Sequence, residues 1–207
     1  MKINENDLHL LRERVEKILS KKRFLHTVSV EKCAQRLSVA LEVTDVNIVR
    51  AAALLHDITK ELDLSEHLEL LRGVNLSEED LEAPAILHSF SAPFVILRDF
   101  PEYSDERILS AVKNHTTGDD GMSLTDLIIF IADYAEQTRT NKSCITVNKF
   151  LFDNLEALTK TERLERLYKA CLMAIGFTKE YLSASGGRIN QRTDRCEKFL
   201  KEKILLL

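Results

Sequence analysis

The sequence contains few of the residues that interrupt regular backbone structure: among 207 residues there are 6 Gly and 3 Pro. Leu, Ala, Glu, Lys and Ile fill the long stretches between short polar clusters, and the alternation typical of strands is nearly absent. Both observations predict an all-α protein. A hydrophobic fraction of 44% in a chain of this length is sufficient for a buried core, so we expect a single domain over residues 1–207.

Long apolar runs, basic stripes and paired cysteines are also absent. The longest apolar run has about six residues, far below the ~20 that span a bilayer, so no membrane role is expected. The net charge of -4 is spread along the chain, which argues against a nucleic-acid surface. The N-terminus is polar and no CxxC pair occurs, which indicates a cytoplasmic protein with reduced thiols. These thiols belong to Cys33, Cys144, Cys171 and Cys196.

Apolar residues recur at helical spacing along most of the chain. The expected helices are 6–20, 24–42, one from a cap at Thr44 or Asp45 to the doublet His56-Asp57, 65–72, one after Ser77, one capped by Ser104 that ends at His115, one capped by Ser123 with Asp126, 147–158, 161–184 and 191–203. The segment 83–100 is left unassigned because prolines interrupt it. The polar segment 140–143 separates a core of about 21–139 from a C-terminal helical segment of about 145–207.

Four polar residues lie where burial is expected: His26, His56, Asp57 and Asp133. An unpaired imidazole or carboxylate is costly to bury, and these four donors together are the ligands of a divalent-metal site. The alternative is a set of unrelated polar groups. In that interpretation, His26 is a hydrogen-bonded core histidine and Asp133 pairs with Arg139.

The remaining histidines divide into two kinds. His88 and His115 lie at element ends, where their side chains reach a common cleft and bind either a second metal or the phosphates of a substrate. For His115 the alternative is a favourable interaction with the dipole of its own helix. His9 and His67 lie among charged residues, and we expect both on solvated faces.

Three basic residues border the expected metal site. Lys60 projects from about the same helix face as His56, Arg23 precedes His26 by three positions, and Arg139 follows Asp133 by six. Guanidinium and ammonium groups at these positions are suited to phosphate oxygens. Solvated basic residues at helix ends are the alternative.

The order of these residues resembles the HD-domain superfamily of metal-dependent phosphohydrolases. A closer resemblance is to the bacterial YqeK-type symmetrical diadenosine tetraphosphate hydrolases, and it covers roughly residues 21–139. It is carried by RFLH at 23–26, ALLHDITK at 53–60, NHTTGDDGMS at 114–123 and IADYAEQTR at 131–139. The chain departs from the usual pattern at His88-Ser89, where family members have glycine after the histidine, and at Gln137-Thr138, where they have a proline.

The resemblance implies a compact helical HD-domain bundle with additional C-terminal helices. It implies cleavage of diadenosine tetraphosphate with water into two ADP, at a centre of one or two iron ions. Mixed imidazole and carboxylate ligation also suits manganese, cobalt or zinc. By position, the metal ligands are His26, His56, Asp57 and Asp133. The catalytic residues are Asp57, Lys60, His88 and His115, and the substrate-binding residues are Arg23, Lys60, His88, His115 and Arg139.

Two other functions are compatible with the same residues. One is an HD-domain phosphohydrolase that acts on a mononucleotide or a guanosine polyphosphate. The other is a regulatory module that senses a nucleotide without turnover. In each case the partner is a nucleotide, no nucleic acid is involved, and a homodimer is left open.

Overall fold

The computed structural model describes residues 2–207, and every regular element in this range is helical, which confirms the predicted all-α class. The α-helices are α1 (Glu5–Ile18), α2 (Lys21–Ala40), α3 (Val46–Leu55), α4 (Leu64–Leu70), α5 (Glu78–Leu81), α6 (Leu87–Asp99), α7 (Glu106–Asn114), α8 (Leu124–Ala135), α9 (Lys142–Phe152), α10 (Lys160–Ser185) and α11 (Gln191–Leu205). Three short 3-10 helices are η1 (Pro84–Ile86), η2 (Pro101–Tyr103) and η3 (Leu155–Ala157).

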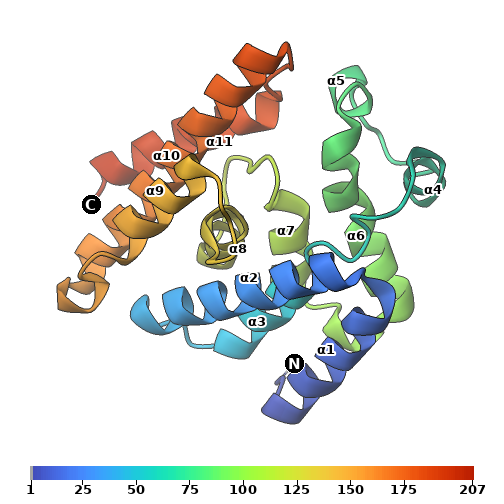
Figure 1. Cartoon of the computed structure of the whole chain (residues 1–207), viewed down its shortest axis with the longest axis horizontal. Helices are drawn as coiled ribbons and strands as arrows, with labels where there is room; N and C mark the ends of the chain where they lie inside the picture. Colours follow the sequence, from blue (N-terminus) through green and yellow to red (C-terminus); the bar gives the residue numbers. More distant parts are fainter. Residues whose placement is uncertain (1) are drawn as a thin grey trace.

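Helix α8 lies in the middle of the molecule, where it contacts α2, α3, α7, α9 and α10. Figure 1 shows α9, α10 and α11 on one side of α8 and the segment from α4 to α6 on the other. Buried apolar residues from Ile3 to Leu200 form one continuous cluster, so both sides share a core with α8. Burial of this apolar surface is the main stabilising contribution.

The central position of α8 follows from its sequence. Residues 127–132 carry no polar side chain and all six are buried. Ser123 accepts from the backbone of Asp126, whose carboxylate accepts from the backbone of Ser123, which confirms the expected capping box. The helix therefore starts at a defined residue, and Asp133 is fixed near its end.

The segment 83–100, for which the sequence pattern predicts no element, forms η1 and α6, and Pro93 lies inside α6. Two expected helix starts are wrong. Helix α7 is capped by Asp105, whose side chain accepts from the Arg107 backbone, and Ser104 is not its cap. Helix α9 begins at Lys142 because Asn141 caps it, so the predicted boundary at 140–143 overlaps a helix start.

The loop after α7 is held by the start of α11. The Thr193 hydroxyl donates to the Thr117 carbonyl (3.0 Å), and Arg192 contacts Asp119 (2.8 Å). The buried Cys196 lies against the same loop. The C-terminal helices therefore support a loop that belongs to the central part of the chain.

Two further expectations concern the cysteines and membrane-spanning helices. The four cysteines are free and buried, as expected for reduced thiols. None of the helices within residues 2–207 is both long enough and apolar enough to cross a membrane.

Candidate metal centre

The doublet His56-Asp57 lies directly after α3, at the centre of a cluster of polar side chains. His56 is fully buried and Asp57 is 3% exposed. Helices α2 and α8 supply His26 and Asp133, while His88 comes from α6 and His115 follows α7. Contacts of α2 with α3 and α8, and of α7 with α3 and α6, bring these residues together although they span more than a hundred positions of sequence.

One group of ligand atoms surrounds Oδ2 of Asp57. His56 Nε2 lies 3.2 Å and His26 Nε2 lies 3.7 Å from this oxygen. Asp133 Oδ1 lies 3.0 Å from His26 Nε2 and 3.8 Å from His56 Nε2. The four residues predicted as metal ligands therefore point toward one another.

A second group surrounds the other oxygen of the same carboxylate. Asp57 Oδ1 lies 3.3 Å from His88 Nε2 and 3.7 Å from His115 Nε2. The two Nε2 atoms lie 3.0 Å apart. Asp57 thus presents one oxygen to each group, which is the arrangement of a carboxylate that can bridge two cations.

The opposite ring nitrogens determine what these Nε2 atoms can bind. In His56, His88 and His115, Nδ1 lies 2.7, 2.9 and 2.6 Å, respectively, from a backbone carbonyl three residues earlier. A carbonyl only accepts, so Nδ1 carries the hydrogen and Nε2 of the neutral ring carries the lone pair. The carbonyls belong to Ala53, Ala85 and Val112.

In His26, too, Nδ1 faces a hydrogen-bond acceptor, but this acceptor belongs to a side chain. Its Nδ1 lies 3.2 Å from Oε1 of Glu136, which the sequence analysis did not single out. Within residues 2–207, Nε2 of His26 and Nε2 of His56 are buried and have no hydrogen-bond partner of acceptable geometry. Unsatisfied buried polar atoms are costly, and a cation would satisfy both. Lone pairs and carboxylate oxygens that converge in this way are the donor set of a divalent metal.

The electrostatics of the cluster keep both carboxylates ionised. Burial opposes the charge on Asp57, but His56 and His115 lower the pKa of its carboxyl group well below the usual range. Burial also opposes the charge on Asp133, yet His26 and His56 lower the pKa of this group too.

The surroundings shift the pKa values of His26 and His88 in opposite directions. Burial disfavours a charged His26, but the carboxylates of Asp133 and Glu136 raise the pKa of its imidazole to about 9. For His88, burial and the nearby His115 lower the pKa well below its ordinary value. In the absence of a cation, His26 therefore carries a proton near neutral pH and His88 does not.

Two arginines hold the carboxylates from the solvent side. Arg23 Nη1 donates to Asp57 Oδ2 (2.8 Å), and Arg139 Nη2 donates to Asp133 Oδ1 (2.6 Å). The pairing of Arg139 with Asp133 is the one considered as an alternative to metal ligation, and it coexists with the cluster. Arg23 and Arg139 are 28% and 36% exposed in their side chains, so both face the solvent as well as the ligands.

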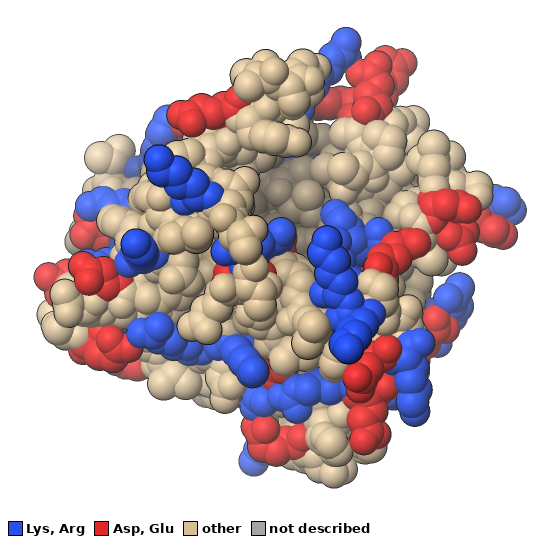
Figure 2. Space-filling view, in the orientation of Figure 1, with Lys and Arg blue, Asp and Glu red and all other residues tan. Residues whose placement is uncertain are grey.

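Lys60 lies beside the second group. Its Nζ donates to the Ala85 carbonyl (3.3 Å) and lies 3.4 Å from His88 Nε2. Burial lowers the pKa of this amine although the acidic neighbour Asp57 opposes the shift. Figure 2 shows a hollow in one face of the molecule, with Lys and Arg side chains along its lower edge.

Two histidines lie outside the cluster. The His9 side chain is 65% exposed and pairs with Glu13, as expected for a solvated face. The expectation for His67 is wrong: it is 5% exposed, and its Nδ1 lies 2.9 Å from the Ser91 hydroxyl of α6. The packing of α4 on α6 buries it, and neighbours in sequence do not reveal such a contact.

Sequence reasoning also missed two side chains that contact the cluster. The Thr116 hydroxyl lies 3.2 Å from His88 Nε2 and 3.1 Å from His115 Nε2, and its single hydrogen can satisfy only one of them. Glu136 follows Asp133 by three positions, one helical turn, and this spacing is the signal that could have indicated it.

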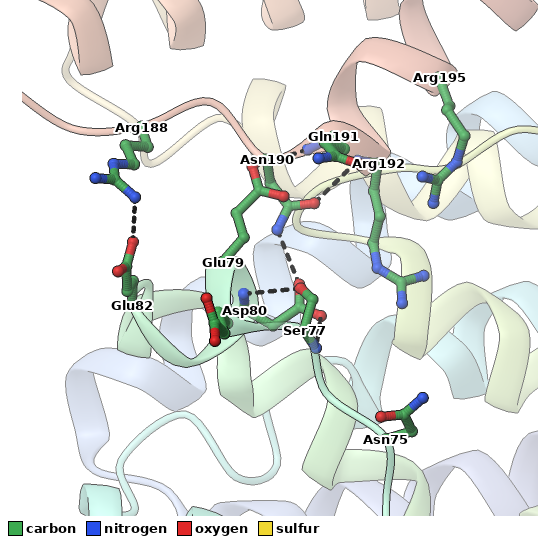
Figure 3. Close-up of a pocket in the computed structure, with 11 residues that line it drawn as sticks. Asn75, Ser77, Glu79, Asp80, Glu82, Arg188, Asn190, Gln191, Arg192 and Arg195 are labelled. Atoms are coloured by element: carbon green, nitrogen blue, oxygen red, sulfur yellow. Dashed lines mark hydrogen bonds and ion pairs between the residues drawn. The ribbon is translucent and has the colours of Figure 1, made fainter.

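A separate cavity of about 660 Å³ lies between α5 and the start of α11 (Figure 3). None of the predicted ligands lines it. Several of its polar groups pair with one another: Asn190 donates to the buried Asp80 (2.9 Å), and Arg188 pairs with Glu82. These contacts explain how α11 is joined to α5, and they leave the cluster around Asp57 as the candidate site.

Comparison with protein families places the cluster in a known context. The HD domain family matches residues 23–138, a segment that contains the four predicted ligands together with Arg23 and Lys60 and ends one residue before Arg139. A solved structure from Clostridium acetobutylicum, described as a predicted HD superfamily hydrolase involved in NAD metabolism, is similar with a TM-score of 0.81 and 26% identity. The similarity covers 98% of this chain and 100% of that one.

Curated proteins give a second set of similarities. Two proteins named symmetrical bis(5'-nucleosyl)-tetraphosphatase, from Staphylococcus aureus and Halalkalibacterium halodurans, are 34% and 35% identical to 59% and 58% of this chain. The chain spans 62% and 64% of their respective lengths. A Mycoplasma genitalium protein named probable nicotinate-nucleotide adenylyltransferase/Ap4A hydrolase is 29% identical over 66% of this chain and 38% of its own length.

Proposed function

Because the chain belongs to the HD-domain family, we propose that the side chains around Asp57 form a divalent-metal centre that hydrolyses dinucleoside tetraphosphates. HD domains bind divalent metals, and the donors here fit that role by orientation and by charge. The observation that carries the proposal is the convergence of the Asp57 and Asp133 carboxylates on Nε2 of His26 and Nε2 of His56, two buried atoms that lack a hydrogen-bond partner within residues 2–207.

We propose that the first group, His26, His56, Asp57 and Asp133, holds one ion. The second group, Asp57, His88 and His115, has its ligand atoms within 4.8 Å of one another and offers a second position. Since Nε2 of His88 and Nε2 of His115 are acceptors, they suit a cation better than a phosphate oxygen. The resemblance to YqeK-type hydrolases favours iron at this centre. The same donors also suit manganese and cobalt.

Hydrolysis of a phosphoanhydride requires an activated water and stabilisation of the charge that gathers on phosphoryl oxygens. A divalent cation supplies Lewis acidity and lowers the pKa of the water that it binds. The residues of the chain supply the remaining requirements, which are orientation of the polyphosphate and neutralisation of its charge.

The three basic residues lie where they can orient a polyphosphate and neutralise its charge on both sides of the cluster. Arg23 and Arg139 can offer forked donors to phosphates on the side of the first group. Lys60 lies beside His88 and can neutralise a phosphate on the side of the second group. A tetraphosphate bound across both groups would present its central bridge to the centre, and cleavage there releases two nucleoside diphosphates.

The substrate part of the proposal is supported by the relatives named symmetrical bis(5'-nucleosyl)-tetraphosphatase. The test is incubation of the purified protein with diadenosine tetraphosphate and iron or manganese, followed by separation of the products. We expect two ADP per substrate. ATP plus AMP would contradict symmetrical cleavage.

A panel with a mononucleotide and a guanosine polyphosphate tests substrate choice in the same assay. Faster hydrolysis of either compound would assign the site to another HD-domain activity. Tight nucleotide binding with no hydrolysis at any metal concentration would indicate a sensory module.

A further inference from the structure

His26 differs from the other three histidines of the cluster in what orients its ring. In the others, the Nδ1 hydrogen is accepted by a backbone carbonyl three residues earlier. In His26 it is accepted by a side chain, the carboxylate of Glu136 (3.2 Å). A backbone carbonyl cannot be removed by substitution, whereas Glu136 can.

Glu136 lies on the far side of the His26 ring from the ligand atoms. Nε2 of His26 faces Asp133 (3.0 Å), while Nδ1 faces Glu136. The two nitrogens point in divergent directions from one ring, so a cation bound at Nε2 does not contact Glu136. The Glu136 side chain is 1% exposed, so a substrate that approaches from the solvent does not contact it.

The carboxylate of Glu136 is itself held in place. The Thr138 backbone N–H donates to Oε2 (2.5 Å), and the Thr138 hydroxyl donates to Oε1 (2.6 Å). These bonds form because α8 ends at Ala135 and the chain turns back on itself. The same turn carries Arg139, whose guanidinium binds Asp133. The end of α8 and the turn after it therefore place the proposed ligand Asp133, the arginine that binds it and the partner of the proposed ligand His26.

We propose that Glu136 is a positioning residue for metal binding: it fixes His26 in the tautomer and orientation that direct Nε2 at the cation. A carboxylate on the distal nitrogen of a metal-bound imidazole also makes the ligand more basic, and loss of such a partner typically weakens metal binding by about 10- to 100-fold. The inference rests on the proposed metal centre but assigns a role to a residue outside it.

The first test measures metal affinity directly. Glu136→Gln keeps the size of the side chain and removes its charge. We expect the variant to bind Co²⁺ about 10- to 100-fold more weakly than the unaltered protein, by competition with a chromophoric chelator. Glu156→Gln is the matched control, because this exposed carboxylate pairs with Arg36 far from the cluster. It is expected to leave the affinity unchanged.

The second test reads the tautomer of His26, which a merely structural role would not move. Long-range ¹H–¹⁵N spectra of the metal-free protein, at a pH above the pKa of His26, distinguish Nδ1–H from Nε2–H. We expect Nδ1–H in the unaltered protein and a mixture of both forms in Glu136→Gln. Circular dichroism is recorded on the same samples to compare helical content.

Each outcome decides the inference. Equal Co²⁺ affinity and an unchanged tautomer in folded Glu136→Gln would overturn it. If this variant does not fold, Glu136→Asp takes its place, since it keeps the charge and shortens the side chain by one methylene, which withdraws the carboxylate from His26 Nδ1. A several-fold loss of affinity then supports the inference, and no loss overturns it. If the unaltered protein binds no divalent metal, the proposed centre itself fails, a result distinct from failure of Glu136 alone.

Discussion

The carboxylate of Asp57 contacts two groups of histidines, one through each of its oxygens. Arg23 adds a hydrogen bond to Oδ2. The residue therefore links the proposed metal positions to each other and to the basic residues at the solvent side. Its loss is expected to affect binding and catalysis together.

Replacement of Asp57 by Ala is expected to abolish bound metal and phosphohydrolase activity and to leave helicity nearly unchanged, since α3 ends before it. Metal content by elemental analysis, product formation and circular dichroism are the measurements. Asp45→Ala is the control, because Asp45 is an exposed carboxylate paired with Arg107. Full activity in a metal-free Asp57→Ala protein would refute the metal centre.

Metal binding is also expected to release a proton. The pKa of His26 is about 9 in the absence of a cation, and its Nδ1 hydrogen is committed to Glu136, so the proton displaced at neutral pH leaves Nε2. Titration with a divalent metal at pH 7.5 in weak buffer is expected to release about one proton from this residue. The release should decline as the pH rises past the pKa of His26, and its absence at pH 7.5 would contradict this assignment.

The same pKa has a consequence for the stability of the metal-free fold. Because the pKa of His26 is raised from 6.5 to about 9, its contribution is fully present below pH 6.5 and is lost as the pH rises through 9. Thermal unfolding of metal-free protein across this range measures the effect. Saturating metal is expected to change the pH dependence, since the bound form of His26 is deprotonated.

At the scale of elements, the loop after α7 depends on α11 for its conformation. Gly118 has φ of +64°, and a Cβ added there would lie 2.5 Å from Cys196 Sγ. Gly121 in the same loop has φ of +68° and nothing within 4 Å of an added Cβ. Both glycines therefore adopt a left-handed backbone conformation, but only Gly118 is packed closely against other side chains.

Gly118→Ala is expected to cost about 2–5 kcal/mol of unfolding free energy, the sum of left-handed strain and steric overlap. Gly121→Ala is expected to cost only about 1–2 kcal/mol, from the strain. Thermal denaturation of both variants measures the difference. If overlap with the Cys196 thiol causes the larger cost at Gly118, Cys196→Ala in the Gly118→Ala background restores part of the lost unfolding free energy. Equal costs at the two glycines would exclude this overlap as a cause.

The proposed ligands could be predicted from the sequence because they are polar residues on otherwise apolar helices. His26, His56 and Asp133 were identified in this way, and the capping box of α8 was read from Ser123 and Asp126. Glu136 was not, because a glutamate after a helix usually lies in solvent. His67 was misjudged for the same reason: only the packing of α6 on α4 shows that it is buried.

The sequence pattern also did not predict the helix that contains Pro93 or the helix start at Asn141. Pro93 is tolerated inside α6, although proline lacks the N–H that a helix interior requires. Asn141 starts α9 earlier than the apolar spacing suggests. In both cases the tertiary environment outweighs the local preference.

For the whole molecule, we propose that residues 1–207 form one cooperative domain, since one apolar cluster runs from Ile3 to Leu200. Thermal unfolding is then expected to give a single transition, with the calorimetric enthalpy equal to the van't Hoff value. Two resolved transitions would separate the C-terminal helices from the central part of the chain. Calorimetry and circular dichroism on the full chain provide the comparison.

The pairing of Arg23 with Asp57 and of Arg139 with Asp133 has an electrical consequence for the order of events. These four charges sum to zero, so every divalent ion that enters leaves an excess of positive charge in a partly buried site. A polyphosphate carries one negative charge on each of its phosphates and can neutralise that excess. Cation and substrate are therefore expected to strengthen each other's binding by the same factor, because such coupling is reciprocal.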